Sequence, residues 1–208
     1  MSTCAGRDPE RRPFVGPTSL GFTLIELMVT VGLLAVLMVI AAPSFVSFQR
    51  NSELTATANS FLASLTSARA EAMKRQLRAF VIPAEGNDWR TGWVVFLDAN
   101  GDVTTGAVAM EAGDIELARV GPLPPSLSVD TSNGASGFAQ GAVNYAMFNG
   151  SGFLTLIGGN FPTGGADSID FKSTADSDST RRVIASVAGR MRVCKPAVDQ
   201  GCSVGAGF

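Results

Sequence analysis

Two hydrophobic patterns divide this chain near residue 48. From Phe22 to Phe48 the sequence is apolar on every side of a helix, and Glu26 is its one charge. A helix of this length spans about 40 Å, more than the roughly 30 Å hydrocarbon core of a bilayer. We therefore predict a transmembrane helix over 22–48. The upstream arginines place its N-terminus in the cytoplasm and the rest of the chain outside; they are Arg7, Arg11 and Arg12.

Two targeting signals compete with a permanent anchor. A secretory signal needs a short apolar core and a small-residue cleavage site, whereas Ala41-Ala42 is followed by Pro43 and further apolar residues. A twin-arginine signal could begin at Arg11-Arg12, but Glu26 would then lie inside its apolar core. In an anchor, an intramembrane carboxylate costs about 2.5–3.5 kcal/mol and needs a partner. The alternative for Glu26 is a side chain that reaches the cytoplasmic headgroups.

After Pro43 the apolar residues recur at steps of three and four, which predicts an amphipathic continuation of the helix over 49–79. Basic residues gather toward its end, where cations complement the helix dipole. The apolar stripe needs a cover, which the C-terminal part of the chain can provide. The stripe consists of Leu54, Ala58, Phe61, Leu62, Leu65, Ala68, Ala72 and Met73, and the basic residues are Arg69, Lys74, Arg75 and Arg78.

From residue 80 onward, short apolar runs alternate with turn residues. The spacing of about ten residues, without intervening helices, indicates an antiparallel β domain over 80–208 rather than βαβ units. Segments 121–141 and 158–166 are predicted loops. The fold class is therefore α+β, a long helix packed against one or two small sheets. The runs are 79–83, 92–98, 115–120, 143–148, 153–157, 168–172, 181–187 and 191–194.

Composition excludes several functions. The 208 residues contain no histidine, which removes Ser-His-Asp and Cys-His catalysis and His-ligated metals. No P-loop, G-x-S-x-G or helix-opening G-x-G-x-x-G motif occurs. The formal charge of −2 argues against a chain that binds nucleic acid uniformly over its surface. We expect neither an enzyme nor a cofactor.

One acidic segment invites a calcium interpretation. Asp98, Asn100 and Asp102 place oxygens at alternate positions, as at the start of an EF-hand loop. The template then fails, because Val103 stands where the glycine should be and Ala109 where the bidentate glutamate should be. Asn100-Gly101 between two apolar runs is a strong signal for a short hairpin. We predict the hairpin and no metal site.

The segment Gly21-Phe22-Thr23-Leu24-Ile25-Glu26-Leu27 resembles the processing site of type IV pilins and type II secretion pseudopilins. The resemblance implies that a prepilin peptidase cuts after Gly21, removes the leader 1–21 and leaves Phe22 as a methylated N-terminus. It implies that Glu26 pairs with the terminal amine of a neighbouring subunit during assembly, which gives the buried charge a partner. The expected protein crosses the inner membrane once and assembles with other pilin or pseudopilin subunits.

The stretch from Gly92 to Asp102 resembles a signature of the FimT/GspH branch of this family, the minor subunits. In this topology Cys4 lies in the removed leader. Cys194 and Cys202, with seven residues between them, both face the periplasm, where disulfides persist. We predict a disulfide that contributes about 2–3 kcal/mol in the chain-entropy model. Two free thiols, or a metal pair without further ligands, are the alternatives.

Residues 181–195 hold five basic side chains and no acid. Strand alternation puts Arg190 and Arg192 on one face, at the spacing of neighbouring phosphates. The alternative is an exposed polar face that discourages aggregation. Gly189-Arg190-x-Arg192 also resembles a motif of FimT-type minor pilins that bind DNA, which implies phosphate contacts by Arg190 and Arg192. Local charge adds Lys195 and Arg182 to this candidate site.

Three functions follow from these observations. The first is a minor pilin at or near the tip of a type IV pilus that binds DNA non-specifically for uptake. The second is a GspH-type minor pseudopilin of a type II secretion system. The third is a membrane-anchored periplasmic binding domain that never assembles. Glu26 separates the third from the first two, because only a filament subunit needs it for assembly.

Overall fold

The computed structural model describes residues 21–106, 108–131, 138–140, 143–176 and 178–203, without the side chains of 42, 43, 139 and 140. Helix α1 (Leu24–Arg75) comprises 52 residues. The chain divides into two compact units, residues 1–44 and 45–208, and each is considered by itself. Positions 1–20 of the predicted leader, with Cys4, lie outside the described residues.

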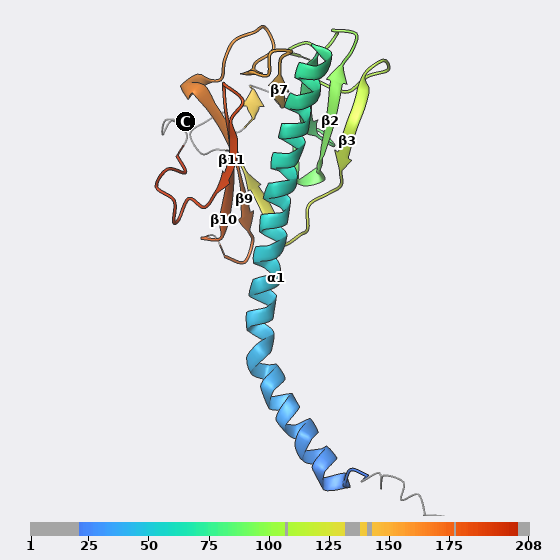
Figure 1. Ribbon diagram of the computed structural model, residues 1–208, viewed down its shortest axis with the longest axis vertical. Helices are drawn as coiled ribbons and strands as arrows, with labels where there is room; N and C mark the ends of the chain where they lie inside the picture. Colours follow the sequence, from blue (N-terminus) through green and yellow to red (C-terminus); the bar gives the residue numbers. More distant parts are fainter. Residues whose placement is uncertain (1–20, 107, 132–137, 141–142, 177, 204–208) are drawn as a thin grey trace, which may run out of the picture. The chain divides into compact units, whose positions relative to one another are not determined.

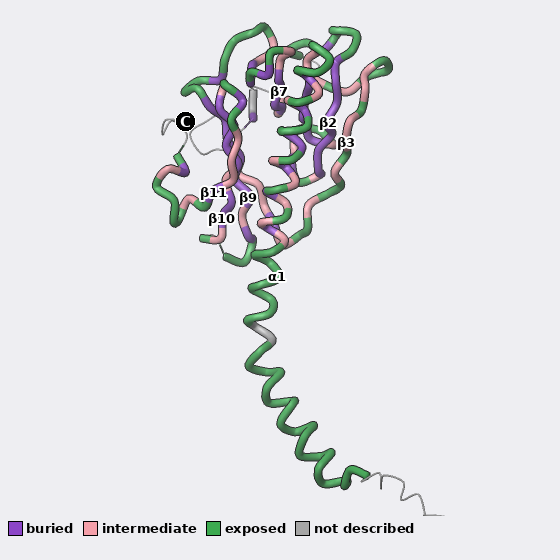
Figure 2. The backbone as a smooth tube through the Cα atoms, in the orientation of Figure 1, coloured by how far each residue is buried: buried purple, intermediate pink, exposed green. Residues whose placement is uncertain are grey.

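In the first unit, α1 begins with an apolar segment. Leu24–Ala41 has a mean hydropathy of 2.6 and no buried residue, so its length and composition suit a membrane span. Thr23 precedes the helix, and its Oγ1 accepts a hydrogen bond from the Glu26 amide at 3.3 Å. This is an N-cap contact, and the Glu26 carboxylate in the first turn complements the helix dipole. Figure 2 colours the backbone of this segment as exposed.

In the second unit, α1 buries one stripe of its surface. Figure 2 shows buried positions at regular intervals along the C-terminal part of the helix. This confirms the predicted periodicity for six of the eight predicted positions, whereas Leu62 is half-buried and Met73 is exposed. The fully buried positions are Leu54, Ala58, Phe61, Leu65, Ala68 and Ala72.

The helix ends at Arg75, four residues before the predicted end at position 79. Gln76 adopts a left-handed conformation with φ of 58°, and the Leu77 amide donates to the Ala72 carbonyl at 3.2 Å. This pattern is a Schellman motif, which satisfies the last carbonyls of a helix and stops it. Arg78 already belongs to the first strand.

Two antiparallel sheets pack around the second half of α1, as Figure 1 shows. The five-stranded sheet has the order β3-β2-β1-β7-β8, and the four-stranded sheet has the order β11-β10-β9-β4. The α+β prediction is therefore confirmed. In the first sheet the strands are β1 (Arg78–Pro83), β2 (Trp93–Asp98), β3 (Ile115–Val120), β7 (Ala146–Phe148) and β8 (Leu154–Thr155). In the second they are β4 (Leu127–Asp130), β9 (Ala166–Ser173), β10 (Thr180–Ser186) and β11 (Met191–Cys194).

The prediction of a loop over 121–141 was wrong in part. Strand β4 lies inside it and pairs with β9, Leu127 opposite Ser173 and Val129 opposite Phe171. The prolines before β4 and the polar residues within it weaken the local sequence signal for a strand, although pairing with β9 stabilises it. Inside the same segment, β5 (Ala139–Gln140) pairs with β6 (Val143–Asn144). The predicted loop 158–166 contains the 3-10 helix η2 (Thr163–Gly165) and ends where β9 begins.

Phe61 on α1 is the centre of the core. Its ring makes edge-to-face contacts with four aromatic rings, to Trp89 at 5.3 Å, Trp93 at 5.1 Å, Phe138 at 5.9 Å and Phe171 at 5.6 Å between centroids. Because Trp93 comes from the five-stranded sheet and Phe171 from the four-stranded sheet, this one side chain joins both sheets to the helix.

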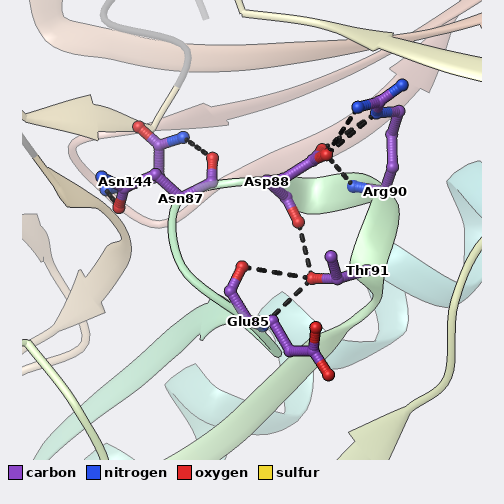
Figure 3. A network of polar contacts seen from close by, with 6 residues as sticks. All are labelled: Glu85, Asn87, Asp88, Arg90, Thr91 and Asn144. Atoms are coloured by element: carbon purple, nitrogen blue, oxygen red, sulfur yellow. Dashed lines mark hydrogen bonds and ion pairs between the residues drawn. The ribbon is translucent and has the colours of Figure 1, made fainter.

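A polar network holds Trp89 in that core (Figure 3). Trp89 begins the 3-10 helix η1 (Trp89–Thr91), and Asp88 caps it by accepting from the Arg90 amide at 2.9 Å. The Arg90 guanidinium also pairs with Asp88 at 2.7 Å and lowers the pKa of its carboxyl group. The Thr91 hydroxyl donates to the Asp88 carbonyl at 2.7 Å, and the Asn144 amide donates to Asn87 Oδ1 at 3.1 Å.

Phe61→Ala should destabilise the globular unit by about 3–5 kcal/mol, because it leaves a cavity between four rings. Fluorescence of Trp89 and Trp93 during denaturant unfolding measures this, since the chain has two tryptophans. Phe153→Ala, which truncates an exposed phenylalanine, is the control and should change stability by less than about 0.5 kcal/mol. A loss below about 1 kcal/mol for Phe61→Ala would contradict this account of the core.

Candidate functional site

The turn between β10 and β11 presents the basic motif. The Gly189 amide donates to the Ser186 carbonyl and the Ser186 amide to the Arg190 carbonyl, both at 2.8 Å, which closes a tight hairpin. Gly189 has φ of 75°, and a Cβ atom there would lie 2.2 Å from Arg69 Nε. Both the backbone conformation and the close contact therefore require glycine at this position.

Arg69 on α1 fixes this turn. Its Nε donates to the Gly152 carbonyl at 2.8 Å and its Nη2 to the Ala188 carbonyl at 3.3 Å. From the sequence, Arg69 is predicted only to be a cation near the end of the helix. Nothing in the sequence connects it with a turn 119 residues away, because the contact exists only when the hairpin packs on the helix.

A groove of about 670 Å³ runs between α1 and β11, and we call it the α1–β11 groove. Arg190 is exposed and Arg192 is half-buried, and both line it. Met191 and Val193 pack against the core, as the predicted strand alternation requires. The lining consists of Thr66, Arg69, Ala70, Met73, Gly189, Arg190, Met191 and Arg192.

Arg192 also holds the C-terminal loop. Its guanidinium donates to the Gly201 carbonyl and lies 3.9 Å from the Asp199 carboxylate. Next to this contact, Cys194 and Cys202 form the predicted disulfide, with their Cα atoms 5.8 Å apart. The loop is thus attached to β11 by a covalent bond and by Arg192.

Arg182 does not line the α1–β11 groove, so its assignment to the DNA-binding site from local charge was wrong. Its Nε and Nη2 donate to both oxygens of Asp170, at 2.6 and 2.8 Å, and its Nη1 donates to the Cys202 carbonyl at 2.9 Å. The hydrogen bond to Asp170 raises the pKa of the guanidinium. With its side chain 14% exposed and its donors engaged, Arg182 stabilises the disulfide loop instead of reaching for a phosphate.

Lys195 is exposed at the start of the C-terminal loop. Its carbonyl accepts from the amides of Val198 and Asp199, at 3.1 and 2.9 Å, which begins the turn that leads to Cys202. It does not line the α1–β11 groove.

The acidic segment after β2 forms a long loop, so the predicted short hairpin was wrong. The partner strand β3 begins only at Ile115. Asn100-Gly101 still makes a local turn, in which the Gly101 amide donates to Asp98 Oδ1 at 2.6 Å. The loop brings one carboxylate oxygen each of Asp98, Asp102 and Asp114 within 4.8 Å of one another. Asp114 accepts from the amides of Ala99 and Glu111, so it closes the loop.

Comparisons with known proteins place this fold in a family. The model of the type II transport protein GspH matches residues 57–189, which is more than half of the chain. This chain belongs to the GspH family. The model of the prokaryotic N-terminal methylation motif matches residues 18–42, which include Gly21, Phe22 and Glu26. No curated protein sequence matches this GspH-family chain.

Solved structures agree with the fold of this GspH-family chain. The type IV minor pilin FimU of Pseudomonas aeruginosa is 20% identical, with a TM-score of 0.50 over 71% of this chain and 92% of FimU. The minor pseudopilin EpsH of the Vibrio cholerae type 2 secretion system is 16% identical, with a TM-score of 0.44 over 69% and 98%. The likeness to FimU concerns the fold alone. The two family models make the chain a pilin-type subunit, a minor pilin or a pseudopilin, in a family of structural subunits.

Gly189→Ala should destabilise the globular unit by more than about 1 kcal/mol and displace Arg69 from the turn, because it adds a clash to a strained φ. Gly158→Ala is the matched control, since Gly158 also has positive φ but no atom within 4 Å of a Cβ. Denaturant unfolding of both variants separates backbone strain from contact with Arg69. Equal losses of unfolding free energy in the two variants would contradict the proposed packing of the turn on α1.

Proposed function

We propose that this chain is a minor pilin at or near the tip of a type IV pilus, and that its α1–β11 groove binds the DNA backbone without sequence specificity. Family membership leaves the pilus and the type II secretion system as the two machineries. The basic lining of the groove is the observation that favours the pilus.

Three arginines line this groove, and none of the described residues that line it is acidic. Arg69 donates to neutral carbonyls, which orient its guanidinium without neutralising its charge. Arg190 is exposed just before β11, and Arg192 lies within that strand. Phosphate groups of a nucleic acid strand match such a row of guanidiniums, and phosphate contacts carry no base information.

The N-terminal segment supplies the assembly part of the proposal. We propose cleavage after Gly21 by a prepilin peptidase at the cytoplasmic face, followed by methylation of the Phe22 amine. The processed helix remains in the inner membrane with the globular unit in the periplasm. Glu26 then pairs with the terminal amine of a neighbouring subunit, which compensates the cost of a carboxylate among apolar side chains.

The GspH-type pseudopilin of a type II secretion system is the second candidate. The match to the GspH family model favours it directly. In that role the same helix would assemble with other pseudopilins, and the groove would not need to bind DNA. The match to the methylation motif weighs against the third possibility, a domain that never assembles.

Arg190→Ala/Arg192→Ala should weaken DNA binding about tenfold or more at low salt. The slope of log affinity against log salt concentration should fall by about 2, since each phosphate contact contributes roughly 0.9. The measurement uses the full chain in nanodiscs of zwitterionic lipid and a DNA duplex over a salt series.

Lys74→Ala/Arg119→Ala removes the same formal charge from two exposed sites outside the groove and is the matched control. This variant should keep the slope of the wild-type chain. Equal losses of DNA affinity in both double variants, or no DNA binding by the wild-type chain at low salt, would contradict the proposal. Arg190 and Arg192 would then only form an exposed polar face. The pseudopilin would then be the better candidate.

Glu26→Ala should abolish incorporation into filaments while membrane insertion stays intact, because the variant removes the partner of the terminal amine. The measurement compares the amounts of the chain in sheared filaments and in the membrane fraction. Glu71→Ala, which removes a half-buried carboxylate near the other end of α1, is the control and should assemble normally. Normal assembly of Glu26→Ala would refute the pilin mechanism.

A further inference from the structure

Arg181 occupies an unusual place at the start of β10. The inward-facing residues of this strand that follow it, Val183 and Ala185, are completely buried in the core around Phe61. Arg181 continues this row toward the strand's N-terminal end, and it is only 9% exposed. A charged group at the end of a buried apolar row needs a compensating partner.

The chain supplies little compensation. Arg181 Nη1 donates to the Thr180 carbonyl at 3.1 Å. Among the described residues no carboxylate forms an ion pair with it, whereas its neighbour Arg182 binds Asp170 with two hydrogen bonds. Burial lowers the pKa of the Arg181 guanidinium, and no neighbouring acid counteracts this effect. A nearly buried guanidinium without a counter-ion is costly for the fold.

Arg181 lines a groove of about 480 Å³ along α1, and we call it the Arg181 groove. Apart from Arg181, it is bordered mainly by amide and hydroxyl side chains, which can donate hydrogen bonds to an anion. Its lining consists of Phe48, Asn51, Ser52, Thr55, Ala56, Asn59 and Arg181. A guanidinium surrounded by neutral donors is suited to a carboxylate, which accepts two parallel hydrogen bonds from arginine.

We propose that the Arg181 groove receives an acidic side chain of a neighbouring pilin-type subunit, so that Arg181 is an assembly contact. This inference rests on the proposed role as a filament subunit. The ion pair becomes buried only on assembly, and the cost that Arg181 imposes on the isolated chain is then offset by its partner.

A DNA backbone fits the position less well, because Arg181 is the one cation among the described residues that line the groove. A lipid phosphate is the other alternative occupant, and the effect of anionic lipid on the thermal midpoint tests it.

Arg181→Met tests the inference with the full chain. If Arg181 stabilises the isolated fold, its replacement should lower the thermal midpoint of unfolding. If Arg181 instead pairs with a neighbouring subunit, its replacement should leave the midpoint unchanged or raise it. We expect an unchanged or higher midpoint, followed by Trp89 and Trp93 fluorescence. We also expect at least a tenfold loss of the chain from sheared filaments. Arg119→Met, which removes an exposed arginine outside both grooves, is the control and should assemble normally.

Asn59→Asp provides a second variant that keeps Arg181. Asn59 lines the groove from α1, so an aspartate there supplies a carboxylate from within the chain. We expect a higher thermal midpoint together with reduced incorporation, because the internal carboxylate competes with that of the neighbour. Combining Asn59→Asp with Arg181→Met should abolish the gain in midpoint.

Three results would overturn the inference. The first is wild-type incorporation of Arg181→Met, and the second is a lower midpoint for that variant with no gain for Asn59→Asp. The third is a midpoint that anionic lipid in nanodiscs raises for the wild-type chain but not for Arg181→Met, which would assign the site to a lipid phosphate. If the wild-type chain itself never enters filaments, the proposed function fails as well, so the two failures are distinguishable.

Discussion

The burial of one helical stripe between two sheets is the constraint on which this structure depends. Phe61 contacts aromatic rings from both sheets, so neither sheet can pack without α1. The same packing fixes the rotation of the helix about its axis. Arg69, two turns after Phe61, is thereby directed at the β10–β11 turn, where it donates to the Ala188 carbonyl. It also donates to the Gly152 carbonyl in the loop between β7 and β8.

The basic segment 181–195 shows how one cluster of charge is divided by the fold. Arg182 is used internally by Asp170 and the disulfide loop. Arg181 faces the helix without a carboxylate partner among the described residues. Arg190 and Arg192 line the α1–β11 groove. The two proposals therefore concern separate surfaces, since Arg181 lines one groove and Arg190 and Arg192 line the other.

The sequence predicts elements well where the signal is local. The periodicity from Leu54 to Ala72 and the β-branched runs locate α1 and most strands, because burial follows the pitch of a helix or strand. Strand β4 was missed, since its pairing with β9 outweighs weak local propensity. The Asn100-Gly101 turn was recognised, but not the length of its loop, because a turn signal does not specify where the partner strand begins.

The candidate site was predictable only in part. Gly189, Arg190 and Arg192 follow from a short motif, and the disulfide follows from topology. Arg69 and the internal role of Arg182 could not be predicted, because their partners lie far away in the sequence. A charge alone does not reveal whether its counter-ion is in the same chain, in a neighbour or in a ligand.

Arginine side-chain NMR of the full chain, with a short DNA duplex added at low salt, tests the central claim most directly. The account predicts that the Nε–H signals of Arg190 and Arg192 shift on DNA binding. The signals of Arg182 and of the distant Arg119 should stay in place. Unchanged Arg190 and Arg192 signals, or larger shifts at Arg119, would contradict the assignment of the α1–β11 groove as the DNA-binding surface.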